Sequence, residues 1–139
     1  MKRFPDCEKV NSYLIVTCEE RQSKMIFENP QRREVCLIEV DGCVIQEGLR
    51  CDYAMRAENN REEFYIELKG RDVKHAFSQL ETSLQKLSED PYKHPKICFI
   101  ISTRCPLDGP QIQTMKKLMK NKYHAKLIIK NREWSHTLN

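Results

Sequence analysis

A nearly continuous apolar run, KICFIIS at residues 96–102, constrains the fold of this chain more than any other stretch. A strand that is apolar on both faces is typical of a parallel pair in a sheet covered on both sides. The segment before it is amphipathic, and its apolar residues recur at spacings of three, four and seven, which predicts a helix capped by Asp72. These apolar residues are Val73, Ala76, Phe77, Leu80, Leu84 and Leu87.

Shorter apolar patterns flank this unit on both sides. Upstream, they predict strands near residues 13–17, 24–27, 34–40, 43–49, 50–55 and 63–69, with a tight turn at 41–42. Downstream, they predict a helix from Pro110 to about Lys120 and a last strand at 125–130. The inward residues expected for that helix are Ile112, Met115, Leu118 and Met119. We therefore predict one α/β domain over residues 1–139: an antiparallel strand meander followed by β-α-β-α-β, forming a mixed (α+β) sheet with helices on its faces.

Composition limits the class of protein. Of the 139 residues, 40% are hydrophobic and 32% charged, which is typical of a soluble globular domain. No apolar run reaches the length needed to span a bilayer, and acidic residues interrupt any signal-peptide pattern near the start, so we expect a cytoplasmic protein without a membrane partner.

The seven cysteines include no CxxC pair, which argues against a structural zinc site. Several lie in apolar strand-like runs, where a reduced cysteine acts as a small hydrophobic residue, and this favours a reducing compartment. A cysteine-based redox or hydrolytic enzyme stays open as a hypothesis, and a thiol with a depressed pKa would support it. The histidines available to such a thiol are His75, His94, His124 and His136.

Two charged residues interrupt the strand before the predicted helix. Glu67 and Lys69 alternate with Ile66 and Leu68, so the two charges share one face of the strand. Asp52 lies in the preceding strand, and adjacent strands can bring it beside Glu67. Two carboxylates suit Mg²⁺, which activates water for phosphodiester cleavage, while a lysine can orient that water or offset charge on the phosphate. The alternative is a half-exposed strand with a surface ion pair and no chemistry.

Asp52, then Glu67-Leu68-Lys69 on a strand, then an amphipathic helix together resemble the PD-(D/E)xK nuclease superfamily. The resemblance spans about residues 34–130 and implies a restriction-endonuclease-like core. It implies Asp52, Glu67 and Lys69 as catalytic residues, with Asp52, Glu67 and the Leu68 carbonyl as ligands of Mg²⁺ or Mn²⁺. His75 and Gln79, four residues apart on the helix, are the implied helpers.

Three features depart from that family pattern or leave it open. Cys51 stands where a proline often precedes the aspartate, and Ser83 stands where the RecB-like subgroup has an aromatic residue. Many members also carry an early acidic metal ligand. The residues that could fill that role here are Glu8, Glu20, Glu28 and Glu39.

The end of the chain is basic. Residues 110–139 carry seven lysines and arginines against the single acidic residue Glu133. Such a surface can contact phosphates, although a solvated helix and strand would look the same. The residues that we expect to bind nucleic acid are Lys116, Lys117, Lys120, Lys122, Lys126 and Lys130.

Together these features predict a metal-dependent endonuclease that acts on DNA in defence, restriction or repair. Its expected partners are DNA and either a second copy of the chain or a recruiting protein subunit, because a chain of this size has no room for a separate target-recognition domain. The alternative function is a non-catalytic nucleic-acid-binding or partner-docking module of the same fold.

Overall fold

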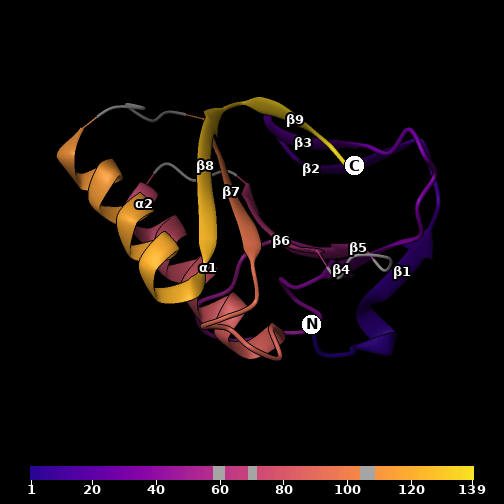
Figure 1. Ribbon diagram of the computed structural model, residues 1–139, viewed down its shortest axis with the longest axis horizontal. Coiled ribbons are helices and arrows are strands. Elements are labelled where there is room, and N and C mark those ends of the chain that lie inside the picture. Colours follow the sequence, from indigo (N-terminus) through magenta and orange to yellow (C-terminus); the bar gives the residue numbers. More distant parts are fainter. Residues whose placement is uncertain (58–61, 69–71, 104–108) are drawn as a thin grey trace.

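The computed structural model of the protein describes residues 1–57, 62–68, 72–103 and 109–139. Within these residues the chain forms two sheets, two helices, α1 (Val73–Leu87) and α2 (Pro110–Tyr123), and a short 3-10 turn at Pro5–Cys7 (Figure 1). The large sheet has the strand order β1-β4-β5-β6-β7-β8, and the small sheet has the order β2-β3-β9. The strands are β1 (Glu8–Asn11), β2 (Ile15–Glu20), β3 (Ser23–Glu28), β4 (Val35–Glu39), β5 (Tyr53–Ala57), β6 (Glu62–Leu68), β7 (Lys96–Ser102), β8 (Ala125–Asn131) and β9 (Glu133–Thr137).

The large sheet is mixed, as the sequence predicts. Strands β4, β5 and β6 form an antiparallel meander, and β6, β7 and β8 are parallel. Strand β7 is the apolar run at 96–102, and it lies between two parallel neighbours, with Ile101 in register with Leu68 on one side and Lys130 on the other. Its residues are apolar on both faces because both faces of the sheet are covered.

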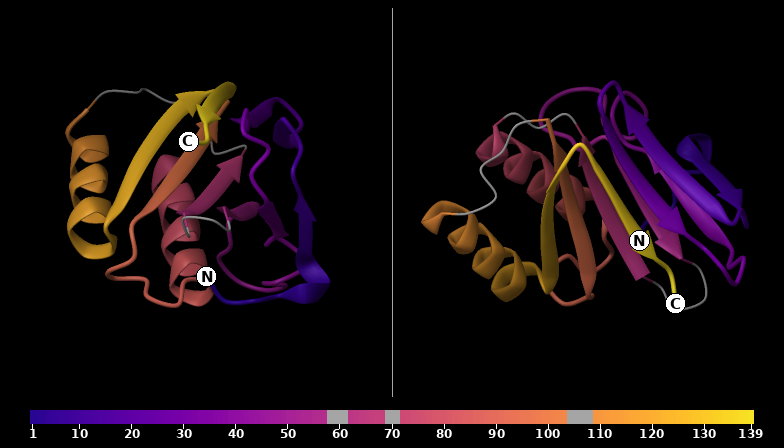
Figure 2. Two further views of the ribbon diagram at one scale, coloured as in Figure 1. Left: turned by 45° about the vertical axis from the view of Figure 1, so that its right-hand side comes forward. Right: turned by 90° about the horizontal axis from the view of Figure 1, so that it is seen from above.

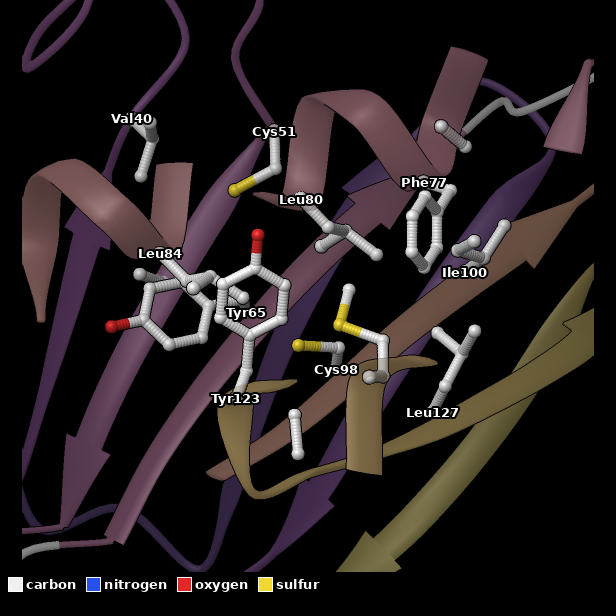
Figure 3. Close-up of a cluster of buried hydrophobic side chains, with 14 of the residues drawn as sticks. Val40, Cys51, Tyr65, Phe77, Leu80, Leu84, Cys98, Ile100, Tyr123 and Leu127 are labelled. Carbon is white, nitrogen blue, oxygen red and sulfur yellow. The ribbon is translucent and has the colours of Figure 1, made fainter. Parts of the chain in front are cut away.

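Both helices lie on one face of the large sheet, which corrects the expectation of helices on its two faces (Figure 2). Crossovers between parallel strands are almost always right-handed, so two successive crossovers in the same direction leave both helices on the same side. Helix α1 begins where predicted, because the Asp72 carboxylate accepts hydrogen bonds from the backbone amides of Lys74 and His75. The core beneath the helices includes Leu80, Leu84, Cys51 and Cys98 (Figure 3).

The small sheet covers the opposite face, and the sequence analysis missed this layer. Strands β2 and β3 form a hairpin, while β9 pairs in parallel with β3, so Lys24 lies opposite Glu133. Met25 and Phe27 of β3 pack on Phe64 and Phe99 of the large sheet in a second core. The strand at 125–130 is therefore not the last one, since β9 follows it.

Other boundaries also differ from the prediction. Residues 43–49 form turns and a bend instead of a strand. Helix α2 continues to Tyr123, which is fully buried, and ends at His124 in a left-handed conformation. Leu118, expected to point inward, is 39% exposed, while Ile112 and Met119 are buried and Met115 is partly buried. Among the described residues, neither helix is long and apolar enough to cross a membrane.

Two of the cysteines form a disulfide, Cys7–Cys43, which the sequence analysis did not predict. The two residues lie 36 positions apart, and local sequence spacing gave no sign of the bond. The described free cysteines, in contrast, are buried as expected. They are Cys18, Cys36, Cys51 and Cys98.

Burial also bears on the cysteine-enzyme hypothesis. Desolvation raises the pKa of the Cys18 and Cys98 thiols to about 12, and it raises the pKa of Cys51 as well. A reactive thiol needs a lowered pKa, so these three are poor nucleophiles. Cys105 lies outside the described residues.

Candidate functional site

Asp52 and Glu67 come together at one end of the large sheet, where β5 begins and β6 ends. Tyr53 pairs with Ile66, and therefore the next residues along the ladder are Asp52 and Glu67. The Asp52 amide donates to the Ile66 carbonyl at 3.1 Å, and the Leu68 amide donates to Asp52 Oδ2 at 2.7 Å. Both carboxylates are buried, with 7% of Asp52 and 5% of Glu67 exposed. The sequence predicted this pairing correctly because a meander places consecutive strands side by side. We call these two residues the carboxylate pair.

A second sign of proximity comes from the electrostatics around the carboxylate pair. Desolvation is the largest cause of the raised pKa of Cys51, and the negative charges of Glu67 and Asp52 both add to it. Since both charges act on one thiol, the two carboxylates share one neighbourhood. The sequence placed Cys51 in the position of a missing proline, and the structure makes it a buried core residue behind the pair.

A cavity of about 430 Å³ opens beside Asp52 on the helix-covered side of the sheet. His75 and Gln79, the two predicted helpers on α1, both line it. They reach the cavity because they lie one helical turn apart on the first turns of α1, immediately after the segment that leaves β6. The structure therefore brings both predicted helpers to Asp52.

Two hydrogen bonds from α1 hold the segment that leads into Asp52. The Gln79 side-chain amide donates to the Arg50 carbonyl at 3.0 Å, and the Cys51 amide donates to the Ser83 hydroxyl at 2.7 Å. Ser83 is fully buried. These contacts fix the backbone on the N-terminal side of Asp52. The Asp52 carbonyl is fixed as well, because it accepts a hydrogen bond from the Val40 amide at 3.1 Å.

Sequence reasoning missed Ser83 and Arg50 as contributors to this region. The Arg50 side chain donates to Asp41 Oδ1 at 2.6 Å, and both residues line the cavity. The only sequence signal was the predicted turn at 41–42, because an ion pair nine residues apart inside a loop has no periodicity. In the sequence, Ser83 was only a departure from a family pattern. In the structure, its hydroxyl accepts a hydrogen bond from the Cys51 amide.

The candidates for an additional acidic ligand separate in the structure. Glu8 binds Arg56 at 3.1 Å and Arg3 at 3.3 Å, so its carboxylate is engaged in an ion-pair network. Glu28 pairs with Thr137 at the far end of β3. Glu20 and Glu39 lie nearer, because both of them, like Asp52, raise the pKa of Tyr53 after the larger effect of desolvation.

The described residues supply two carboxylates at this site and not a larger cluster. Across residues 1–57, 62–68, 72–103 and 109–139, no three His, Cys, Asp or Glu side chains form a group suited to hold a metal ion. The oxygen donors present are the carboxylate pair and the backbone carbonyl that follows Glu67. Lys69, the predicted catalytic lysine, lies outside the described residues.

The six basic residues predicted to bind nucleic acid do not form one surface. Four of them lie on α2, whose last turn is at the far end of the sheet, where the Lys96 amide donates to the His124 carbonyl at 3.2 Å. Lys126 and Lys130 alternate with the buried Leu127 and Ile129 of β8, so they lie on the other face of the sheet from α2. The four on α2 are Lys116, Lys117, Lys120 and Lys122.

A second buried polar group lies at the opposite end of β6. Glu63 is 2% exposed and accepts a hydrogen bond from the Tyr65 hydroxyl at 2.9 Å. The Met1 ammonium lies 2.9 Å from the Glu63 carboxylate, and His94 Nε2 lies 3.9 Å from it. Each of these neighbours can donate a hydrogen bond to the Glu63 carboxylate or place a positive charge beside it, as expected for a structural buried carboxylate.

No protein-family model, curated protein or solved structure matches this chain.

Proposed function

We propose that the protein is a metal-dependent nuclease that hydrolyses phosphodiester bonds of DNA, with a restriction-endonuclease-like core. The observation that supports this most is the meeting of Asp52 and Glu67 at the end of β6. Two buried carboxylates in one neighbourhood are costly to a fold, because like charges repel and burial penalises both. A divalent cation on oxygen ligands is the common reason for such a pair.

The donors present fit Mg²⁺ or Mn²⁺. Both carboxylates are hard oxygen ligands, and the Leu68 carbonyl is a third oxygen donor at the same strand end. Mg²⁺ sites in enzymes that act on phosphates typically use one or two carboxylates and complete the shell with water and substrate oxygens. When bound, the ion would polarise the scissile phosphate and lower the pKa of a water molecule.

The chain's own residues then divide the remaining work. Asp52 is held by the Leu68 amide, which fixes the direction of its carboxylate before substrate arrives. Gln79 and Ser83 hold the backbone next to it. His75 lines the adjoining cavity, where it can donate a hydrogen bond to a phosphate oxygen or a water. Lys69 follows Leu68 in the sequence, and we assign to it the compensation of charge that develops on the phosphate.

Cleavage of plasmid, linear, single-stranded and branched DNA, with Mg²⁺ or Mn²⁺ and with EDTA, tests this proposal. We expect metal-dependent cleavage that falls by a factor of about 10² or more in Asp52→Asn and Glu67→Gln, since each removes a charged ligand and several kcal/mol of transition-state stabilisation. Lys69→Ala should lose cleavage but keep metal binding in a calorimetric titration.

Glu63→Gln is the matched control, because Glu63 is a buried glutamate on the same strand but at the other end. Its cleavage rate should equal that of the unmodified protein at temperatures where both are folded. Equal cleavage by Glu67→Gln and Glu63→Gln would contradict the proposal. Absence of cleavage in every protein, with DNA binding intact, would favour the non-catalytic binding module instead.

A further inference from the structure

We propose that two arginine-bearing turns, those at Arg21 and Arg132, contact the phosphate backbone of DNA beside the carboxylate pair. We call them the basic turns. This inference rests on the proposed function and names the surface that positions its substrate. The sequence analysis included Arg132 in the basic segment 110–139, but it named neither arginine among the residues expected to bind nucleic acid, and four of the six that it named lie on α2.

Arg132 lies at the same end of the large sheet as the carboxylate pair. It occupies the turn between β8 and β9, where its amide donates to the Ser102 carbonyl at 2.8 Å and its carbonyl accepts from the Lys24 amide at 2.8 Å. Ser102 is the last residue of β7, one position beyond the partner of Leu68. Arg132 is thus fixed by its backbone to both sheets, level with the end of β6.

Arg21 lies at the same end of the large sheet, on the side of β2. It follows Glu20 in the turn between β2 and β3. The carboxylates of Glu20 and Asp52 both act on the Tyr53 hydroxyl, and Asp52 also acts on the Cys18 thiol of β2. The end of β2 therefore lies near the start of β5. The two basic turns stand on the small-sheet side of this end, one toward β5 and the other beyond β7.

Both arginines are suited to meet a partner from solvent. Their side chains are exposed, and neither forms an ion pair with any described residue. Their backbones adopt left-handed conformations, with φ of 48° at Arg21 and 66° at Arg132. Glycine or asparagine takes this conformation at lower cost, so the turn geometry alone does not require an arginine at either position.

Among the neighbouring charges, Lys130 supports the same surface. Lys24 lies in register with Glu19 and Glu133, so acidic residues stand beside it on both neighbouring strands. The Lys130 ammonium lies 4.2 Å from the centre of the Trp134 ring, and Lys130 is in register with Ile101, the partner of Leu68. Lys130 is therefore two strand spacings, or roughly 10 Å, from the end of β6, and it adds a third cation to the basic turns.

The α2 lysines are less well placed for this role. Helix α2 runs away from the end that holds the carboxylate pair, and its last turn, with Lys120 and Lys122, lies beside the start of β7. A duplex laid across the carboxylate pair would meet the basic turns before it met that last turn. Guanidinium groups also suit phosphate, because their planar donors can bind two oxygens at once.

The chain offers a matched control. Arg32 is also exposed and left-handed, with φ of 48°, but it lies near the start of β4, where Val35 pairs with Ala57 at the opposite end of the sheet. Arg32→Gly removes the same charge and relieves the same backbone cost as Arg21→Gly or Arg132→Gly. It therefore separates a local contact from a general effect of net charge or of chain stability.

The experiment measures binding of a fluorescein-labelled 20-base-pair DNA duplex by anisotropy in Ca²⁺, over a series of salt concentrations. We expect the double variant Arg21→Gly and Arg132→Gly to bind about ten- to a hundred-fold more weakly, with the slope of log K against log salt smaller by about 2, one for each phosphate contact. Arg32→Gly should match the unmodified protein in both quantities. A double variant with unchanged affinity and slope would overturn the inference.

Cleavage in Mg²⁺, run beside the binding assay, separates this inference from the proposed function. If the unmodified protein cleaves DNA while the double variant binds DNA equally well, the proposed role of the basic turns is wrong and the proposed nuclease function is supported. If the salt slope of DNA binding falls as expected in the double variant but no protein cleaves DNA, the role of the basic turns is supported and the nuclease function is wrong. If the unmodified protein neither binds nor cleaves DNA, both are wrong. Should a glycine variant fail to fold, Arg21→Asn and Arg132→Asn replace it, since asparagine tolerates the same conformation.

Discussion

The two ends of strand β6 carry buried glutamates on the same face, and the titratable neighbours described above differ between them. At one end, Glu63 is surrounded by donors: the Tyr65 hydroxyl, the Met1 ammonium and the His94 imidazole. At the other end, Glu67 has the carboxylate of Asp52 as its neighbour across the ladder. The first arrangement supplies the compensation that a buried charge needs. The second places a like charge across the ladder, and repulsion between the two carboxylates adds to the cost of burying them.

The neighbours of a buried charge separate structural from functional burial. Burial alone does not distinguish Glu63 from Glu67, since both are almost wholly covered. The kind of neighbour does, because a fold that only needed to bury Glu67 would gain nothing from a second carboxylate beside it. This contrast makes opposite predictions for equivalent substitutions at the two ends.

The largest expected difference is in stability without metal. We expect Glu63→Gln to lower the free energy of unfolding by about 3 kcal/mol, because it leaves a buried ammonium with a neutral partner. Glu67→Gln should cost at least about 2 kcal/mol less, since removing that charge also removes its repulsion with Asp52. Urea unfolding in EDTA, compared at equal m, measures both. Equal losses in the two variants would show that the carboxylate of Asp52 does not destabilise Glu67.

The next effect is the response to metal. Binding of Mg²⁺ at the carboxylate pair should stabilise the protein by about 2.7 kcal/mol at a hundred times its dissociation constant. Asp52→Asn should abolish this gain, and Glu63→Gln should keep it. Thermal melts with MgCl₂, against NaCl at the same ionic strength, test it. A gain that survives in Asp52→Asn would place the metal elsewhere.

The smallest effect concerns another little-exposed carboxylate, that of Glu8, whose partner is Arg56. Burial alone would raise its pKa, but hydrogen bonds from Arg56 and the Phe4 amide outweigh it and lower the pKa to about 2. Because the folded-state pKa is below the unfolded value of 4.5, Glu8 contributes stability above about pH 4.5 and loses it as the pH falls toward 2.

Substitution of Glu8 should therefore flatten the acid limb of the stability curve. We expect Glu8→Gln to cost about 1 to 2 kcal/mol at pH 7 and almost nothing near pH 2, since a hydrogen bond to a charged group is worth about that much. Urea midpoints measured at several pH values between 7 and 2 give the difference. Parallel stability curves for the variant and the unmodified protein would show that the ionised Glu8 carboxylate does not stabilise the fold.

The sequence predicted those parts of the fold whose signal is local. Helix α1 and strand β7 followed from periodicity and from one cap residue, Asp72. The neighbouring positions of Asp52 and Glu67 followed from chain order, because consecutive strands of a meander pair. Gln79 and His75 reached the cavity because the helix begins directly after the strand that carries Glu67.

The parts that sequence reasoning missed depend on distant partners. Strand β9 is a short polar run, EWSHT, and it is a strand because β3 supplies its hydrogen bonds and the His136 ring packs on Phe64 and Phe99 of the second core. The Cys7–Cys43 bond and the Arg56–Glu8 pair likewise join segments far apart in the chain. No local pattern encodes such contacts, since they arise only when the sheets have assembled.

The parallel pairing of β3 with β9 has a consequence for synthesis on the ribosome. Strand β3 leaves the exit tunnel long before its partner strand, Glu133 to Thr137, has been translated. Until then, one edge of β3 lacks its partner strand, and Phe27 lacks its ring contact with His136. Emerging chains bury such surface late and offer it to chaperones in the interval. A stalled chain that ends before residue 133 should therefore be captured by a holdase far more readily than a released one.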